Sequence, residues 1–382
     1  MTRELGQPGA PLLSVIVPVS DGERVIGKCL AALAASDLPR TLWELIVVDD
    51  GSLDTTAPLA AGWADILIRI PGPPHGPAYA RNRGVEASVG SIIVFVDADV
   101  CLHPDALRRI AWAFAWRPEL GAVFGSYDAS PPEPDDLSQY RNLRHYYEHQ
   151  HEAGPSETFW AAIGAVRREA FGRAGRFDEW HFPRPQIEDI ELGYRLRGLG
   201  YPILLDPGIQ GTHLKRWRLK GIVVADMRDR GVPWIRLQLT LGSSDRPGTL
   251  LFRPSEWINS GVVCLAVILF VVAALARSVP IAAAGGVLIV GVLVSNRRLY
   301  RFFRRHRGTA FTLRILPIHL LYYFLTGCAA AWAWCLYHLF GPPGPTPIIQ
   351  AYAESGMKSW PPLPAKAEGS SWLISGASRP PR

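Results

Sequence analysis

Two aspartates that follow a strongly apolar segment are the first candidates for chemistry in this sequence. Residues 92–96 read as a buried strand, and Asp97 and Asp99 come directly after it. Side chains two positions apart on a strand point the same way, so both carboxylates could face one site. Ligands bind at the carboxyl edge of open α/β sheets, and such a pair with phosphate oxygens suits a hard divalent cation. Two solvated loop acids are the alternative interpretation.

Further carboxylates stand at the ends of other expected elements. Asp50 closes a second apolar run at 45–48 and precedes Gly51, where a plain turn residue is the competing role. Glu188 and Asp189 open a helix that continues to about residue 199. A helix N-terminus favours negative charge whether or not it catalyses anything, so a structural role for this pair also stays open.

Basic and aromatic residues accompany these acids. Arg81 lies in an expected helix at 78–87, where it could hold a phosphate or pair with Asp50. The segment 213–217 contains His213, Lys215 and Arg216. A lone histidine is as consistent with packing as with metal binding, and the two cations are as consistent with a membrane surface as with a pyrophosphate.

The elements that must position these residues alternate between strands and helices. Apolar, β-branched runs at 12–18, 45–48, 66–70 and 91–97 predict strands, with helices at about 25–33, 78–87 and after 103. This alternation predicts an α/β, Rossmann-like, mostly parallel sheet with flanking helices. Residues 126–157 are polar, Pro-rich and aromatic, which fits either an acceptor-binding excursion over the site or a surface loop and helix without a ligand.

Composition separates two classes of partner. Of the 382 residues, 48% are hydrophobic and 19% charged, and the net charge is +6. One short stretch between apolar runs holds many of the cations, namely Arg297, Arg298, Arg301, Arg304, Arg305 and Arg307. This placement favours lipid headgroups over nucleic acid as the partner. Five scattered cysteines suggest free thiols in a reducing compartment, and the polar start at 1–10 predicts no signal peptide.

The second half of the chain has the pattern of a membrane anchor. Residues 217–241 alternate basic, aromatic and apolar types, as in helices lying on a membrane, although packing against the first domain competes. Apolar stretches at 257–276, 279–295 and 315–340 predict about three transmembrane helices. The positive-inside rule then places the first domain and the arginine loop in the cytoplasm and the C-terminus outside. The expected divisions are 1–215 catalytic, 216–255 membrane interface, 256–340 transmembrane and 341–382 disordered.

Several motifs in one order resemble family 2 glycosyltransferases of the GT-A fold. They extend from Ser14 to about Trp217 and include the sequences VIVP at 15–18, VVDDGS at 47–52, ARNRG at 80–84, VDAD at 96–99, FDE at 177–179 and ED at 188–189. The resemblance implies a pocket for a nucleotide-diphosphate sugar. The donor-binding residues it implies are Pro18, Asp50, Arg81, Asp97 and Arg216.

The resemblance also assigns roles within that pocket. Asp50 matches the acid that contacts the base, where a uracil imide N–H is preferred and guanine stays open. Asp99, with Asp97 and His213, would bind Mg²⁺ or Mn²⁺, which neutralises the departing nucleoside diphosphate. Asp189, preceded by Glu188, matches the catalytic base that takes a proton from an acceptor hydroxyl, so that a single in-line displacement inverts the anomeric centre.

The acceptor follows from where the chain departs from the family's processive members. Those have Gln-x-x-Arg-Trp where this chain has His213 to Trp217, and a polymer channel would need more membrane helices. We therefore expect a multi-pass inner-membrane enzyme, with its catalytic domain in the cytoplasm, that glycosylates a hydroxyl of a lipid or glycolipid. The alternatives are a polyprenyl-phosphate sugar synthase, whose anionic acceptor needs no base, and a catalytically silent GT-A scaffold or binding protein.

Overall fold

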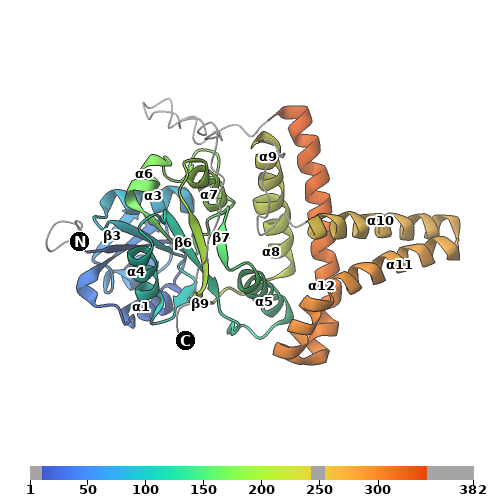
Figure 1. The fold of residues 1–382 in the computed structure, drawn as a ribbon, viewed down its shortest axis with the longest axis horizontal. Coiled ribbons are helices and arrows are strands. Elements are labelled where there is room, and N and C mark those ends of the chain that lie inside the picture. Colours follow the sequence, from blue (N-terminus) through green and yellow to red (C-terminus); the bar gives the residue numbers. More distant parts are fainter. Residues whose placement is uncertain (1–10, 242–253, 342–382) are drawn as a thin grey trace.

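A computed structural model of the chain describes residues 11–241 and 254–341. An α/β domain lies at one end, and a long hairpin of helices projects from the other (Figure 1). The polar start at 1–10 and all of the expected disordered tail except Gly341 lie outside the described residues. So does the end of the expected interface segment, at 242–253.

One mixed sheet of nine strands forms the centre of the α/β domain, in the order β3-β2-β1-β4-β8-β6-β9-β5, with β7 paired to β9. The strands are β1 (Leu13–Val19), β2 (Trp43–Asp50), β3 (Ile66–Ile70), β4 (Ile92–Val96), β5 (Val100–Leu102), β6 (Ala122–Tyr127), β7 (Gly154–Ser156), β8 (Ile163–Arg167) and β9 (Ile203–His213). Strands β1 to β4 pair in parallel, as does β6 with β9.

The expectation of a mostly parallel sheet is wrong for the second half of the domain. Strand β8 enters antiparallel between β4 and β6, and β5 and β7 both pair antiparallel with β9. Apolar runs signal that a strand is buried, but they carry no information on its direction. The four expected strands themselves are present, each within two residues of its predicted start.

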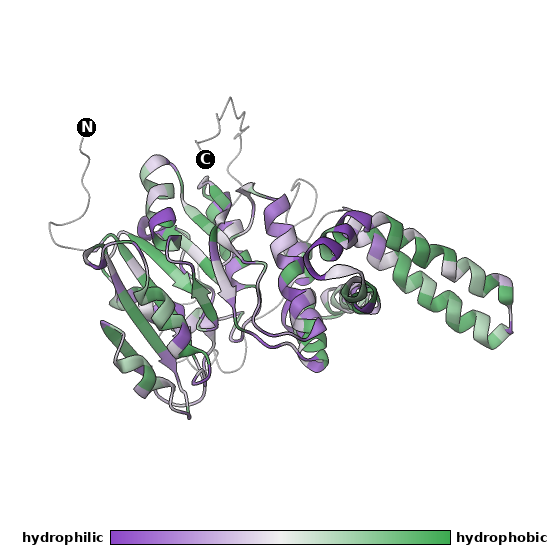
Figure 2. Ribbon diagram, turned by 90° about the horizontal axis from the view of Figure 1, so that it is seen from below, coloured by the Kyte–Doolittle hydropathy of each residue, from purple (hydrophilic) through white to green (hydrophobic). Residues whose placement is uncertain are grey.

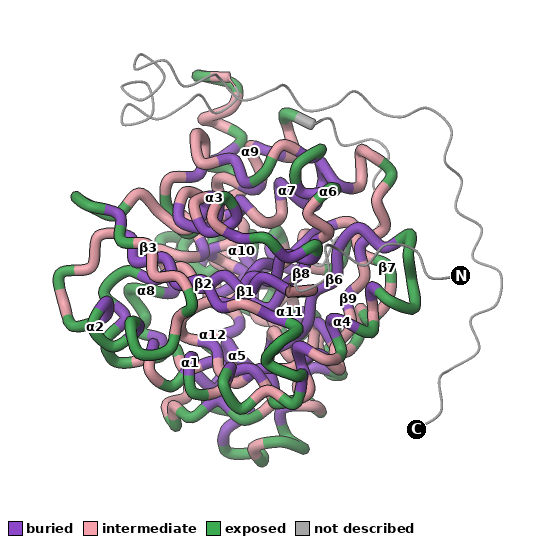
Figure 3. The backbone as a smooth tube through the Cα atoms, turned by 90° about the vertical axis from the view of Figure 1, so that its left-hand side faces the viewer, coloured by how far each residue is buried: buried purple, intermediate pink, exposed green. Residues whose placement is uncertain are grey.

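Helices cover both faces of the sheet, which is why its strands are buried in the middle of Figure 3. On one face α1 (Ile26–Ala34) lies beside β5 and α4 (Ala106–Trp116) beside β9, and both share a hydrophobic core with β1, β2 and β4. Helix α2 (Thr56–Ala61) lies beside α1. The other face is covered by α3 (Pro77–Ala87), α6 (Arg168–Arg173) and α7 (Glu188–Gly198). A 3₁₀ turn at Arg40–Leu42 leads into β2.

A second group of helices lies between the sheet and the hairpin (Figure 1). It comprises α5 (Asp136–His151), α8 (Leu219–Val224), a π-helical turn η2 (Ala225–Gly231), α9 (Val232–Leu241) and the long α12 (Arg297–Phe340). Trp234 and Leu237 of α9 pack against Ile187 and Tyr194 at α7. The described part of the expected interface segment is thus in contact with the α/β domain.

The hairpin consists of α10 (Pro254–Ala276) and α11 (Val279–Ser295), and most of its residues beyond the base are hydrophobic (Figure 2). Leu275, Val279 and Val287 are 70–81% exposed, although water would disfavour so much open hydrocarbon. At 1.5 Å per residue, α10 with its 23 residues is about 34 Å long, enough for a bilayer core. These features fit a hairpin surrounded by lipid.

Only two helices, α10 and α12, have the length and hydropathy of a membrane span among the described residues, and α11 has 17 residues. Helix α12 also does not run alongside the hairpin but crosses its base (Figure 1). The hydroxyl of Tyr323 in α12 lies within hydrogen-bond distance of Asn259 and Glu256 at the start of α10 and of Asn296 after α11. Gly327 of α12 lies against Ser260 and Cys264 of α10. The third expected span therefore lies crosswise to the other two apolar helices.

This arrangement predicts the side of the membrane on which the chain ends. If only α10 and α11 cross the bilayer, the residues after α12 lie on the same side as the α/β domain. In bacterial cells, a green fluorescent protein fused after Arg382 should then be fluorescent, and alkaline phosphatase fused there should be inactive. Alkaline phosphatase inserted after Arg277, at the hairpin tip, should be active. Three crossings would reverse the result at the C-terminus and leave the result at the tip unchanged.

Candidate active site

A cavity of about 1130 Å³ lies at the carboxyl edge of the first strands. Its volume exceeds that of a typical small-molecule pocket, so it has room for an extended ligand. Most of the residues singled out in the sequence line it, although they come from distant segments: Pro18, Asp50, Arg81, Asp97, Asp99, Glu188, Asp189 and Arg216. His213 lies behind this wall, with Nε2 3.5 Å from Oδ2 of Asp99.

Arg81 joins two sets of these acids. Its Nη1 donates to Glu188 Oε1 and its Nη2 to Asp97 Oδ1, each at 2.8 Å. Arg81 and Glu188 are both buried. Although burial acts against the charged form, the nearby carboxylates, Asp97 and Glu188 above all, raise the pKa of Arg81. The expected pairing of Arg81 with Asp50 is not among its contacts, because its two outer nitrogens are used by Asp97 and Glu188.

Asp99 and His213 form the pair best placed to hold a cation. Strand β5 pairs with β9 so that Val100 lies opposite His213, and Tyr127 stacks on the imidazole at 4.1 Å. Burial alone would raise the pKa of Asp99, but the charge and hydrogen bond of His213 lower it overall. Within residues 11–241 and 254–341 no three His, Cys, Asp or Glu side chains converge. A divalent ion here would therefore need phosphate oxygens or water as further ligands.

Asp50 holds the loop that precedes α3. Its Oδ2 accepts from the backbone N–H groups of His75 (2.8 Å) and Gly76 (2.7 Å), and its Oδ1 lies 3.1 Å from His75 Nδ1. Gly76 has φ +102°, and an added Cβ would lie 2.3 Å from the Pro183 carbonyl oxygen. Its position therefore requires glycine. Sequence reasoning missed His75, since the loop at 71–76 has no periodic pattern that could have marked it.

Glu188 and Asp189 are neighbours with different surroundings. Both oxygens of Glu188 are occupied, one by Arg81 and the other by the N–H of Gln186 at 2.9 Å. Asp189 is half-buried, and its hydrogen-bond donors among the described residues are the backbone N–H groups of Ala161 (3.0 Å) and Ile190 (2.8 Å). Burial, and then the charge of Glu188, raise the pKa of Asp189 from 3.8 to about 7. Of the pair, Asp189 is the carboxylate that can exchange a proton near neutral pH.

The two cations after His213 lie at the rim of the cavity. Arg216 is mostly exposed and lies 3.7 Å from Glu133 and 4.0 Å from Asp135. Lys215 also lines the cavity, with its Nζ 4.6 Å from the ring centroid of Trp217. Arg230, which the sequence did not single out, lines the cavity from η2. Lys215, Arg216 and Arg230 thus bring positive charge to a cavity that acidic side chains also line.

Comparisons with known proteins show which family and which relatives the chain is similar to. Residues 14–175 match the model of glycosyl transferase family 2. The chain is 27% identical over 245 residues to validoxylamine A glucosyltransferase of Streptomyces hygroscopicus subsp. limoneus, covering 54% of each chain. It is 34% identical over 193 residues to the putative glycosyltransferase EpsH of Bacillus subtilis, covering 49% of this chain and 52% of EpsH. The chain thus spans about half the length of these curated relatives.

A solved structure has the same fold over most of the chain. It is a mannosyltransferase from Pyrobaculum calidifontis, solved in complex with GDP-Man and Mn²⁺. The TM-score is 0.56 at 21% sequence identity, and the match covers 85% of this chain and 88% of that one. At this identity the likeness establishes the fold, an α/β fold of the GT-A type with a mixed sheet.

The raised pKa of Asp189 predicts a stability effect. Between pH 3.8 and about 7, the unfolded chain ionises Asp189 while the folded chain keeps it protonated, so stability falls over this window. Asp189→Asn removes this loss. The difference in unfolding free energy between the variant and wild type should therefore grow in favour of the variant as pH rises to 7, by at most about 4 kcal/mol. Above pH 7 this difference should stay constant. Thermal unfolding in detergent from pH 4 to 8 measures it. A pH-independent difference would contradict the raised pKa.

Proposed function

Because the chain belongs to glycosyl transferase family 2 through residues 14–175, we propose that it is a membrane-anchored, inverting glycosyltransferase. It moves a sugar from a nucleotide-diphosphate sugar, preferably a UDP-sugar, to a hydroxyl of a lipid or lipid-linked acceptor. The observation that carries this proposal is the single cavity onto which Asp50, Asp99 and Asp189 all open. A base contact, a cation ligand and a general base are therefore available to one bound donor.

The donor lies along the carboxyl edge of the sheet in this proposal. A carboxylate has about four lone-pair positions, and Asp50 already accepts three hydrogen bonds from His75 and Gly76. One position remains for an N–H of the base. Pro18 and Arg216 flank the same space, and the rim cations attract the diphosphate. The complex of the Pyrobaculum mannosyltransferase with GDP-Man supports a nucleotide-sugar donor without deciding the base.

Asp99 and His213 would hold the Mg²⁺ or Mn²⁺ ion that accompanies the donor. Such an ion offsets the charge that develops on the departing nucleoside diphosphate. Asp97 is the less available ligand, because its Oδ1 accepts from Arg81. We propose Asp97 as the residue that orients the donor beside this pair. The Mn²⁺ in the Pyrobaculum complex supports a divalent ion here.

Asp189 is the general base of the proposed reaction. Its unprotonated carboxylate takes the proton of the acceptor hydroxyl while the oxygen attacks the anomeric carbon opposite the leaving diphosphate. Glu188 positions it, since the hydrogen bonds of Glu188 to Arg81 and Gln186 hold the first turn of α7. A pKa of about 7 allows proton transfer near neutral pH. This role favours a hydroxyl acceptor.

The apolar hairpin α10–α11 is the proposed anchor, with the catalytic domain on the cytoplasmic face of the inner membrane. The exposed arginines at the start of α12 would then face lipid headgroups. An anchor beside the cavity gives access to an acceptor dissolved in the bilayer. A polyprenyl-phosphate sugar synthase is the second candidate, favoured by the basic rim of the cavity.

The activity is tested by offering nucleotide sugars with Mn²⁺ to membranes that contain wild type, Asp99→Ala or Asp189→Asn. We expect one donor to be hydrolysed by wild type only with a divalent ion. Asp99→Ala should lower this turnover at least 100-fold, because the departing diphosphate loses its counter-charge. If Asp99→Ala bound the donor without a divalent ion and turned it over as fast as wild type, the metal assignment would be refuted. A protein that binds no nucleotide with Mn²⁺ would be a silent scaffold.

Asp189→Asn should keep donor affinity within about threefold and lower transfer to the acceptor by about 100- to 10,000-fold. The wild-type transfer rate at saturating donor should rise with pH through about 7. Linkage analysis of the product separates the two enzyme candidates, since mild acid cleaves a glycosyl phosphate ester and leaves an ordinary glycoside intact. Equal losses of donor binding and transfer would contradict the base role.

A further inference from the structure

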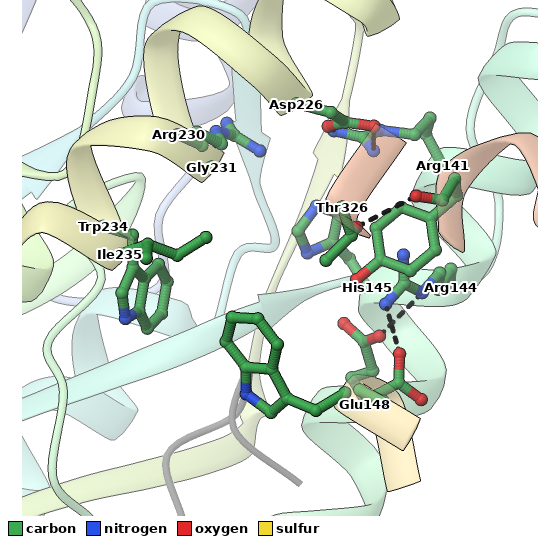
Figure 4. A pocket seen from close by; sticks show the side chains of 13 residues that line it. Arg141, Arg144, His145, Glu148, Asp226, Arg230, Gly231, Trp234, Ile235 and Thr326 are labelled. Carbon is green, nitrogen blue, oxygen red and sulfur yellow. Dashed lines mark hydrogen bonds and ion pairs between the residues drawn. The ribbon is translucent and has the colours of Figure 1, made fainter. Parts of the chain in front are cut away.

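A second, smaller cavity adjoins the active site on the side of the hairpin (Figure 4). It lies between α5, η2, α9, the start of α10 and α12. Its volume of about 110 Å³ is too small for a whole substrate of ordinary size. A ligand of ordinary size that enters it must therefore extend beyond it.

Arg230 is the residue that the two cavities share, because its side chain lines both. No carboxylate lies within 4.0 Å of it among the described residues. The other arginines of the small cavity are neutralised. Arg141 pairs with Asp226 at 2.8 Å, and Arg144 pairs with Glu148 at 2.8 Å and with Glu256 at 3.3 Å. Arg230 is thus a cation without a counter-ion where the active site meets the small cavity.

Apart from these ion pairs, the small cavity offers hydrocarbon contacts. Trp234 and Ile235 of α9 line it together with Trp257 at the base of α10 (Figure 4). Burial, followed by the charges of Arg141 and Arg230, holds the pKa of His145 well below its usual value. His145 is therefore neutral at physiological pH. A ligand here would meet one free guanidinium and an apolar wall that leads towards the hairpin.

We propose that Arg230 binds the phosphate of a long-chain alcohol phosphate, the lipid part of the acceptor. A guanidinium donates paired hydrogen bonds that match phosphate oxygens. The hydrocarbon chain leaves the phosphate along Trp234, Ile235 and Trp257 and enters the bilayer beside α10. The polar end, which is the phosphate itself or a sugar attached to it, reaches the larger cavity and Asp189. This inference rests on the proposed glycosyl transfer and names its acceptor class.

The test uses the full chain purified in detergent, with binding measured by calorimetry. The probes are farnesyl phosphate, farnesol and inorganic phosphate. Wild type should bind farnesyl phosphate at least 10-fold more tightly than farnesol and should bind inorganic phosphate weakly. Arg230→Gln should lower the affinity for farnesyl phosphate about 10- to 100-fold and leave that for farnesol unchanged. Equal wild-type affinities for the phosphate and the alcohol would overturn the proposal, whether or not the variant folds.

Arg228→Gln is the matched control, because Arg228 lies on the same turn, pairs with Asp229 at 2.8 Å and lines neither cavity. It should bind all probes like wild type. Weaker binding of UDP with Mn²⁺ by Arg230→Gln, at unchanged affinity for farnesyl phosphate, would assign Arg230 to the donor and overturn the inference. Donor hydrolysis by wild type is assayed separately. If hydrolysis persists without binding of farnesyl phosphate, only the acceptor class fails; if no donor is bound or hydrolysed, the proposed function fails.

Discussion

The arrangement of the site depends on one buried guanidinium. Arg81 comes from the helix after β3, yet it holds Asp97 at the end of β4 and Glu188 at the start of α7, which lie 16 and 107 residues away along the chain. The carboxylates of Asp97 and Glu188 would be costly to hold so close together without a partner of opposite charge. Because the guanidinium has five N–H donors in one plane, it can satisfy both carboxylates at once. The strand end and the helix are thereby fixed around one cavity.

This link divides the acids into positioning and reacting groups. Asp97 and Glu188 are each paired with the Arg81 guanidinium, whereas Asp99 lies 3.5 Å from His213 and Asp189 accepts from the backbone N–H groups of Ala161 and Ile190. The opposite shifts of their pKa values agree with this division, since that of Asp99 is lowered and that of Asp189 is raised. One cleft thus holds a carboxylate that is charged at neutral pH beside another that can accept and release a proton there.

The sequence was enough to predict the first strands, the acidic motifs and the family, because buried strands and strand-end acids are local signals. It could not predict the antiparallel entry of β8, since an apolar run has no direction. It did not mark His75 or Arg230, whose contacts depend on segments far away in the chain. It predicted residues 315–340, which lie within α12, as a third span. Composition alone cannot tell an apolar helix that crosses the base of a hairpin from one that runs beside it. The roles given to the site residues remain predictions.

The link through Arg81 is tested most directly by a double-mutant cycle on stability. Unfolding free energies are measured in detergent for wild type, Arg81→Gln, Glu188→Gln and the double variant. We expect each single substitution to cost about 3–5 kcal/mol, because it leaves a buried charge without its partner. The double variant should be more stable than the sum of the single effects by about 2 kcal/mol or more. Effects that add within about 0.5 kcal/mol would show that the two residues are independent and would contradict the link.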